Sequence, residues 1–79
     1  MNTRIINLSG ELYVGEAKLV NVQTQSGEIT ILPGHLPIIS VLKNNSRLYL
    51  ADQSGMKEFK VAGGFLHLDT QNNLNILVD

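Results

Sequence analysis

The fold class follows from one stretch of the sequence, Lys57-Glu58-Phe59-Lys60-Val61-Ala62-Gly63-Gly64-Phe65-Leu66-His67-Leu68-Asp69. In its first half, Phe59 and Val61 point to one side of an extended chain, while Glu58 and Lys60 point to the other. A period of two is typical of half-buried antiparallel strands. The glycine pair that follows predicts a bulge or a place where two backbones approach closely.

The same alternation recurs along the chain, in the segments Lys18–Val22, Glu28–Ile31, Arg47–Leu50 and Asn73–Val78. Turn-forming residues separate them at intervals of about 8 to 12 residues, at Ser9-Gly10, Gly15, Ser26-Gly27, Pro33-Gly34, Lys43-Asn44-Asn45, Asp52–Gly55, Gly63-Gly64 and Thr70–Asn73. The spacing within Pro37–Leu42 fits either a short helix or a strand, and its β-branched residues favour the strand. We therefore expect an all-β fold of about eight to ten short antiparallel strands, a small sandwich or barrel.

Length and composition exclude several classes of protein and of site. The chain has 79 residues, no cysteine and a formal charge of -1. One domain spanning residues 1–79 is therefore expected, without a disulfide or a cysteine-based zinc site. The balanced charge and the lack of a basic, aromatic-rich stripe argue against a nucleic-acid partner. No apolar run approaches the length of a transmembrane helix or of the hydrophobic part of a signal peptide.

Candidate chemistry is sparse. His67 and Asp69 share one strand face, but two such residues are only a weak signal for a metal site, and we expect a solvated strand face instead. No Gly-x-Ser-x-Gly motif, phosphate-binding glycine loop or isolated carboxylate pair is present. We therefore expect a protein that is not an enzyme and holds no cofactor.

The segment Ile31-Leu32-Pro33-Gly34-His35-Leu36-Pro37 is the most unusual part of the chain. Two prolines bracket a Gly-His pair and restrict the backbone between two strands. The segment is either a rigid turn or a loop that is presented for recognition.

At this segment the sequence resembles the epsilon subunit of rotary F-type ATP synthases. The likeness rests on Gly-Glu, aliphatic residues and Pro-Gly-His-x-Pro within Ser26–Pro37. Three further segments resemble the family in the same order: an aromatic residue before Gly-Glu in Gly10–Ala17, the charged-aromatic-x-Val-x-Gly-Gly pattern in Lys57–Leu66, and the closing strand Asn73–Asp79. The resemblance implies a flattened β-sandwich that couples rotation of the membrane c-ring to the gamma subunit by contact.

The resemblance also implies roles for single residues. It places Glu28 at the contact with the c-ring loops, and His35 in a loop facing gamma whose shape Pro33 and Gly34 hold. Tyr49, Phe65 and Leu77 lie outside strict alternation, and exposed apolar side chains of this kind dock on partners.

The resemblance also implies partners and a location. The gamma subunit and the c-ring are the implied partners, and the catalytic head is a further candidate partner. Location is implied at the cytoplasmic face of a bacterial plasma membrane, held there by these partners. The sequence departs from the family pattern at Thr30, where a glycine is common, and at Leu8, where a proline is frequent.

The sequence ends at Asp79, where the family continues into a two-helix hairpin that in many members inhibits ATP hydrolysis. We therefore expect coupling without regulation. The alternative is a free-standing β-sandwich that binds a small ligand or peptide in a concave pocket.

Overall fold

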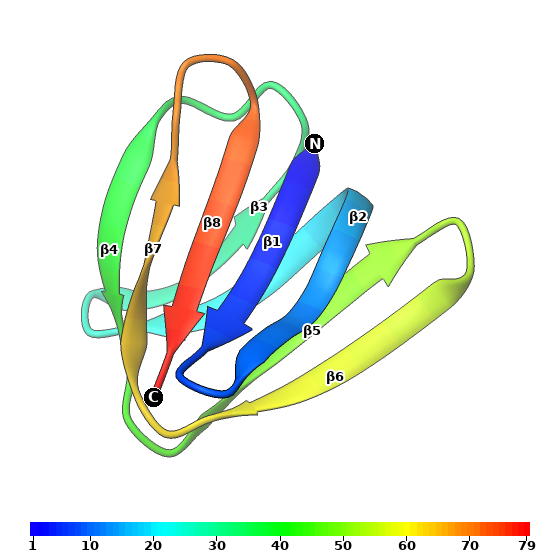
Figure 1. Cartoon of the computed structure of the whole chain (residues 1–79). Helices are drawn as coiled ribbons and strands as arrows, with labels where there is room; N and C mark the ends of the chain where they lie inside the picture. Colours follow the sequence, from blue (N-terminus) through cyan, green and yellow to red (C-terminus); the bar gives the residue numbers. More distant parts are fainter.

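The computed structural model describes residues 1–79 and contains eight strands and no helix (Figure 1). This confirms the predicted all-β fold, including the strand assigned to the ambiguous segment before Lys43. The strands are β1 (Asn2–Asn7), β2 (Gly10–Thr24), β3 (Gly27–Ile31), β4 (Ile38–Leu42), β5 (Ser46–Asp52), β6 (Gly55–Val61), β7 (Gly64–Leu68) and β8 (Asn73–Val78).

The strands form two layers that share β2 (Figure 1). The front sheet contains the first half of β2 followed by β1, β8, β7 and β4. The back sheet contains β3, the second half of β2, β5 and β6. The principal extents of 26 × 25 × 19 Å show that the sandwich is flattened.

β2 passes from one layer to the other within a single strand. Its first half pairs with β1 up to Glu16, and from Ala17 onward it pairs with β5 and then β3. The predicted turn at Gly15 is therefore wrong, because this glycine lies inside β2. A side chain there would come within 2.8 Å of the Tyr13 hydroxyl, so the glycine leaves room for the tyrosine ring instead of reversing the chain.

One strand pair differs from the antiparallel arrangement expected throughout. β1 and β8 run parallel, with Asn2 opposite Asn73 and Ile6 opposite Leu77. Hairpin connections enforce antiparallel pairing only between strands that follow each other closely in sequence. β1 and β8 are the first and last strands, and the rest of the domain is the connection between them.

The core lies between the layers and is built by the inward positions of the alternating segments. Leu48 and Leu50 from the back sheet and Leu74 and Ile76 from the front sheet are fully buried. They belong to a cluster of 15 buried apolar residues. Removing such side chains from water contributes about 1.5–3 kcal/mol each, so the alternation read from the sequence accounts directly for the packing.

The glycine pair before β7 holds two strands close together. A Cβ atom on Gly64 would lie 1.9 Å from the backbone oxygen of Leu77 in β8, and the residue has φ of 135°. Only glycine tolerates both conditions. The close backbone approach predicted from the sequence is thereby confirmed.

Candidate protein-docking surface

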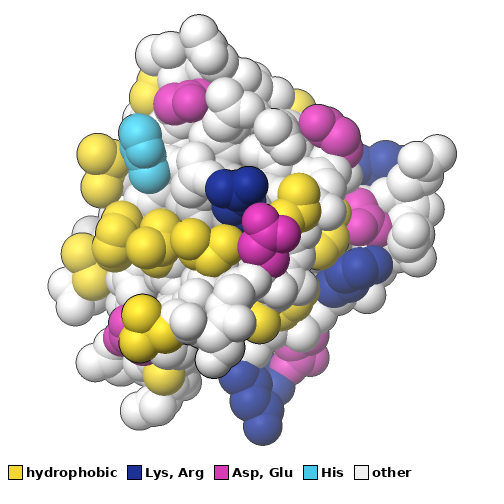
Figure 2. All heavy atoms as spheres, viewed as in Figure 1, with side chains coloured by type: hydrophobic (Ala, Val, Ile, Leu, Met, Phe, Trp, Pro, Cys, Tyr) yellow, Lys and Arg dark blue, Asp and Glu magenta, His cyan; other side chains and the backbone are white.

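An apolar row crosses the outer face of the front sheet. The cross-strand register places Val41 of β4 beside Phe65 of β7, Phe65 beside Leu77 of β8, and Leu77 beside Ile6 of β1. Val41, Phe65 and Leu77 are 51%, 46% and 38% exposed. Figure 2 shows the band of apolar atoms across the middle of this face. We call these four residues the apolar row.

The row exists because β7 and β8 carry apolar residues on both faces. Leu66 and Ile76 point inward and are fully buried, whereas their neighbours Phe65 and Leu77 point outward. Strands that are apolar on both sides are typical of sheets that are covered on both sides. The outer face of the front sheet has this composition but has no second layer over it.

The row is extended at the end of β1. The exposed Leu8 lies in the β1–β2 turn. Leu8 lines a hollow of about 340 Å³ together with Ile6, Phe65, Leu77 and neighbouring residues. Beside this end, Arg4 forms an ion pair with Glu11 at 3.4 Å. The apolar row therefore has a charged border on the β1–β2 side.

A second, more polar row runs next to the first. His67 of β7 lies between Ile39 of β4 and Asn75 of β8, and Asn75 lies beside Arg4 of β1. Ile39 is 74% exposed and His67 is also exposed. The front face thus changes from apolar to mixed over two neighbouring rows.

The Pro-Gly-His segment forms a tight turn at the start of β4. The His35 amide donates a hydrogen bond to the Leu32 carbonyl at 3.0 Å, and Gly34 has φ of 86°. This is the pattern of a type II turn with Pro33 at its second position. The Gly34 amide also donates to the Asn72 side-chain oxygen at 3.2 Å, which ties the turn to the β7–β8 connection.

The outer face of the back sheet is polar in contrast. Glu28 is exposed on β3 and accepts a hydrogen bond from the Gln23 amide at 3.3 Å. Arg47 forms an ion pair with Glu58 on the same face. Tyr49 also lies here, so the structure brings together only Phe65 and Leu77 of the three apolar residues predicted to dock.

The other surface features do not form a concentrated chemical site. His67 and Asp69 belong to no group of three metal-ligating side chains. The Asp69 carboxylate accepts hydrogen bonds from the Gln71 and Asn73 amides at 2.8 and 3.0 Å. The Asn73 amide hydrogen bond is the main reason why the pKa of Asp69 lies below its usual value. This carboxylate therefore shapes a turn.

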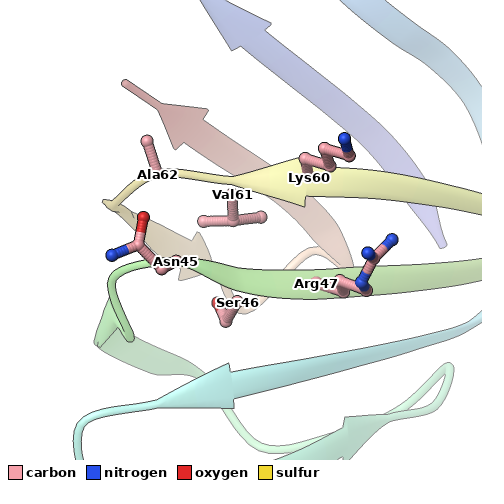
Figure 3. Close-up of a pocket in the computed structure, with 6 residues that line it drawn as sticks. All are labelled: Asn45, Ser46, Arg47, Lys60, Val61 and Ala62. Atoms are coloured by element: carbon pink, nitrogen blue, oxygen red, sulfur yellow. The ribbon is translucent and has the colours of Figure 1, made fainter.

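The hollow in Figure 3 lies where β5 begins and β6 ends. It has a volume of about 360 Å³ and only two apolar residues among its six, which are Asn45, Ser46, Arg47, Lys60, Val61 and Ala62. The charged ends of Arg47 and Lys60 do not point at each other (Figure 3).

The structure contains no helix with the length and apolar composition that a membrane span requires.

Sequence reasoning missed half of the apolar row. Val41 and Ile6, and the adjacent Leu8 and Ile39, were not predicted to dock, although each is an apolar residue at an outward or turn position. The available signal was a pair of adjacent apolar residues in a short strand, as in Ile38-Ile39 and Val41-Leu42. One member of such a pair must point outward.

The fold defines a small β-sandwich domain with one exposed apolar face. Comparison with known proteins gives its family. The family model for the ATP synthase delta/epsilon chain β-sandwich domain matches residues 1–79, the whole chain. The chain belongs to this family.

Curated relatives agree. The ATP synthase epsilon chain of Thermobifida fusca is 37% identical over 71 residues, which are 87% of this chain and 52% of that protein. The epsilon chain of Mycolicibacterium smegmatis is 33% identical over 81 residues, covering all of this chain and 65% of that protein. The chain therefore spans about half to two thirds of the length of these relatives.

Solved structures show the same fold. A chain of the Euglena gracilis mitochondrial ATP synthase, in a structure of OSCP, F1 and c-ring, superposes with a TM-score of 0.89 at 18% identity, covering 99% of this chain and 49% of that one. A chain from the central stalk and c-ring of the Tetrahymena thermophila enzyme gives a TM-score of 0.82 at 16% identity, covering 99% and 62%.

Proposed function

We propose that this chain acts as an epsilon-type subunit in the central stalk of a rotary ATP synthase. It is a non-catalytic part of the complex and couples ion-driven rotation to ATP synthesis through its contacts. The family membership supports this role, as do the neighbouring structures, whose titles name F1, c-ring and central stalk.

The apolar row is the observation that carries the proposal. Phe65 and Leu77 are too exposed to contribute fully to the core, and they stand in register on neighbouring strands. Covering them with a partner would remove apolar surface from water at about 25 cal/mol per Å². We assign this face, together with the turn at Pro33, Gly34 and His35, to the gamma subunit.

Glu28 is assigned to the c-ring loops. It lies on the outer face of the back sheet, away from the apolar row, and its carboxylate is held by a single side-chain amide. It therefore has free acceptor capacity for polar or basic groups. These contacts would keep the subunit at the cytoplasmic face of the membrane.

Co-elution with the cognate gamma subunit on a sizing column tests the proposal. We expect the chain and gamma to elute together at micromolar concentration. Phe65→Glu should weaken the affinity at least tenfold, because hot-spot aromatics contribute about 2 kcal/mol or more and a buried unpaired charge adds a further cost.

The matched control is Met56→Glu. Met56 is an exposed apolar residue on β6, in the back sheet, and is 66% exposed. It should co-elute like the unchanged chain. Loss of binding in both variants, or in neither, would contradict the assignment of the front face, and circular dichroism would show that both variants are folded.

A further inference from the structure

His67 is the only titratable side chain on the three neighbouring strands β4, β7 and β8. It is exposed on the outer face of the front sheet, in the row next to Phe65 and Leu77. Histidine is the side chain that ordinarily changes charge between pH 5 and 8. His67 is the one side chain of this type on these three strands.

The surroundings of His67 are mostly apolar. It lines a hollow of about 340 Å³ with Pro37, Ile38, Ile39 and Leu68. The cross-strand neighbours are Ile39 on β4 and Asn75 on β8, neither of which is charged. A partner side chain that entered this hollow would remove water from the imidazole.

The charged groups nearest in the fold offset a positive imidazole only in part. Arg4 lies beyond Asn75 on β1 and has the same sign, and its ion-pair partner is Glu11 at 3.4 Å. Asp69 follows β7 and its negative charge attracts that of a protonated His67, but no ion pair joins the two side chains, and the carboxylate accepts hydrogen bonds from the amides of Gln71 and Asn73. Covering a charged imidazole without a new partner is unfavourable.

We propose that His67 makes docking on the front face depend on pH, with the neutral imidazole as the form that binds. This rests on the proposed function, which assigns that face to gamma. Binding is then strong near pH 7.5 and weakens as the pH falls and the imidazole gains a proton. Protonation of the docking face would loosen the central stalk contact under acid conditions.

Calorimetric titration of the full chain with the cognate gamma subunit tests this. Between pH 7.5 and pH 5.5 we expect about a tenfold loss of affinity for the unchanged chain, because a histidine side chain ordinarily gains a proton over this range and the form that binds must be neutral. His67→Gln keeps a neutral polar side chain and should remove most of this loss. His67→Arg keeps a positive charge at both pH values and should bind weakly at both.

The results separate the two proposals. Absence of binding at pH 7.5 would refute the docking assignment and this inference with it. Binding at pH 7.5 with equal or higher affinity at pH 5.5 would refute the role of His67 alone. A tenfold loss that persists in His67→Gln would place the responsible group elsewhere, and circular dichroism at both pH values would exclude unfolding as the cause.

Discussion

At the scale of single residues, polar contacts of Asp52 link β2 to the β5–β6 hairpin near its turn. The Tyr13 hydroxyl donates a hydrogen bond to the Asp52 carboxylate at 2.7 Å, and Lys57 lies 3.6 Å from the same carboxylate. Burial, followed by the hydrogen bond and the charge of Asp52, raises the pKa of Tyr13 to about 12. The Tyr13 hydrogen bond is the main cause that lowers the pKa of Asp52.

This contact predicts the behaviour of the domain at alkaline pH. Because the pKa of Tyr13 is higher in the folded state, its contribution to stability is complete below about pH 10, the value for an unfolded tyrosine, and is lost as the pH rises through about 12. The phenolate absorbance should therefore show a step near pH 12 that Tyr13→Phe lacks. Urea unfolding should show that the unchanged chain loses more stability than Tyr13→Phe between these values. A step that survives in Tyr13→Phe would contradict the assignment.

At the scale of elements, the pairing of β7 with β8 depends on a position where no side chain fits. Gly64 opens β7 and lies opposite Val78, with the Leu77 carbonyl oxygen at the position that a Cβ atom would need. The pairing of β7 with β8 also sets Phe65 beside Leu77, so this close approach positions the apolar row. The glycine acts on the docking face through the register of two strands.

Gly64→Ala should therefore be strongly destabilising. The added methyl group would collide with the Leu77 carbonyl, and the positive φ adds strain, so we expect a loss of about 2–4 kcal/mol in the free energy of unfolding. Gly55→Ala is the matched control: it has φ of 118° but no atom within 4 Å of the added carbon. It should lose only about 1–2 kcal/mol. Urea titrations measure both losses in the free energy of unfolding. Equal losses in the two variants would contradict the predicted collision with the Leu77 carbonyl and leave backbone strain as the only effect.

At the scale of the whole molecule, the two outer faces have different chemistry. The front face is apolar around Phe65 and Leu77, and the back face carries polar and charged side chains such as Glu28 and Arg47. The shared strand β2 connects the two layers within one rigid sandwich. A domain of this kind can hold one partner on each face, which is what a coupling element requires.

Glu28→Ala tests this division of roles. We expect ATP-driven ion pumping to fall in vesicles that hold the complete ATP synthase, with about a tenfold weaker contact for one lost charge-assisted hydrogen bond. Co-elution with gamma should be unchanged, because the front face is intact. Glu58→Ala removes a carboxylate from the same polar face and should leave pumping unaffected. Unchanged pumping in Glu28→Ala would contradict the c-ring contact.

Much of the fold could be predicted because alternation is a local property. The inward positions of Leu48, Leu50, Leu74 and Ile76 followed from a period of two, and the close approach at the glycine pair followed from composition. The prediction of a turn at Gly15 was wrong. The sequence does not distinguish a glycine that leaves room for a neighbouring ring from one that reverses the chain. Only half of the apolar row could be predicted from the sequence: Phe65 and Leu77 were predicted to dock, and Val41 and Ile6 were not.

The sequence by itself determined most of the strands, their inward faces and the family, because these depend on side-chain pattern and on residues close together in the chain. Only the tertiary structure decided that β1 pairs in parallel with β8 and that Val41, Phe65, Leu77 and Ile6 form one row. Strand register joins residues that are far apart in sequence, and the alternation pattern is the same whichever strands become neighbours. The docking face is a product of that register.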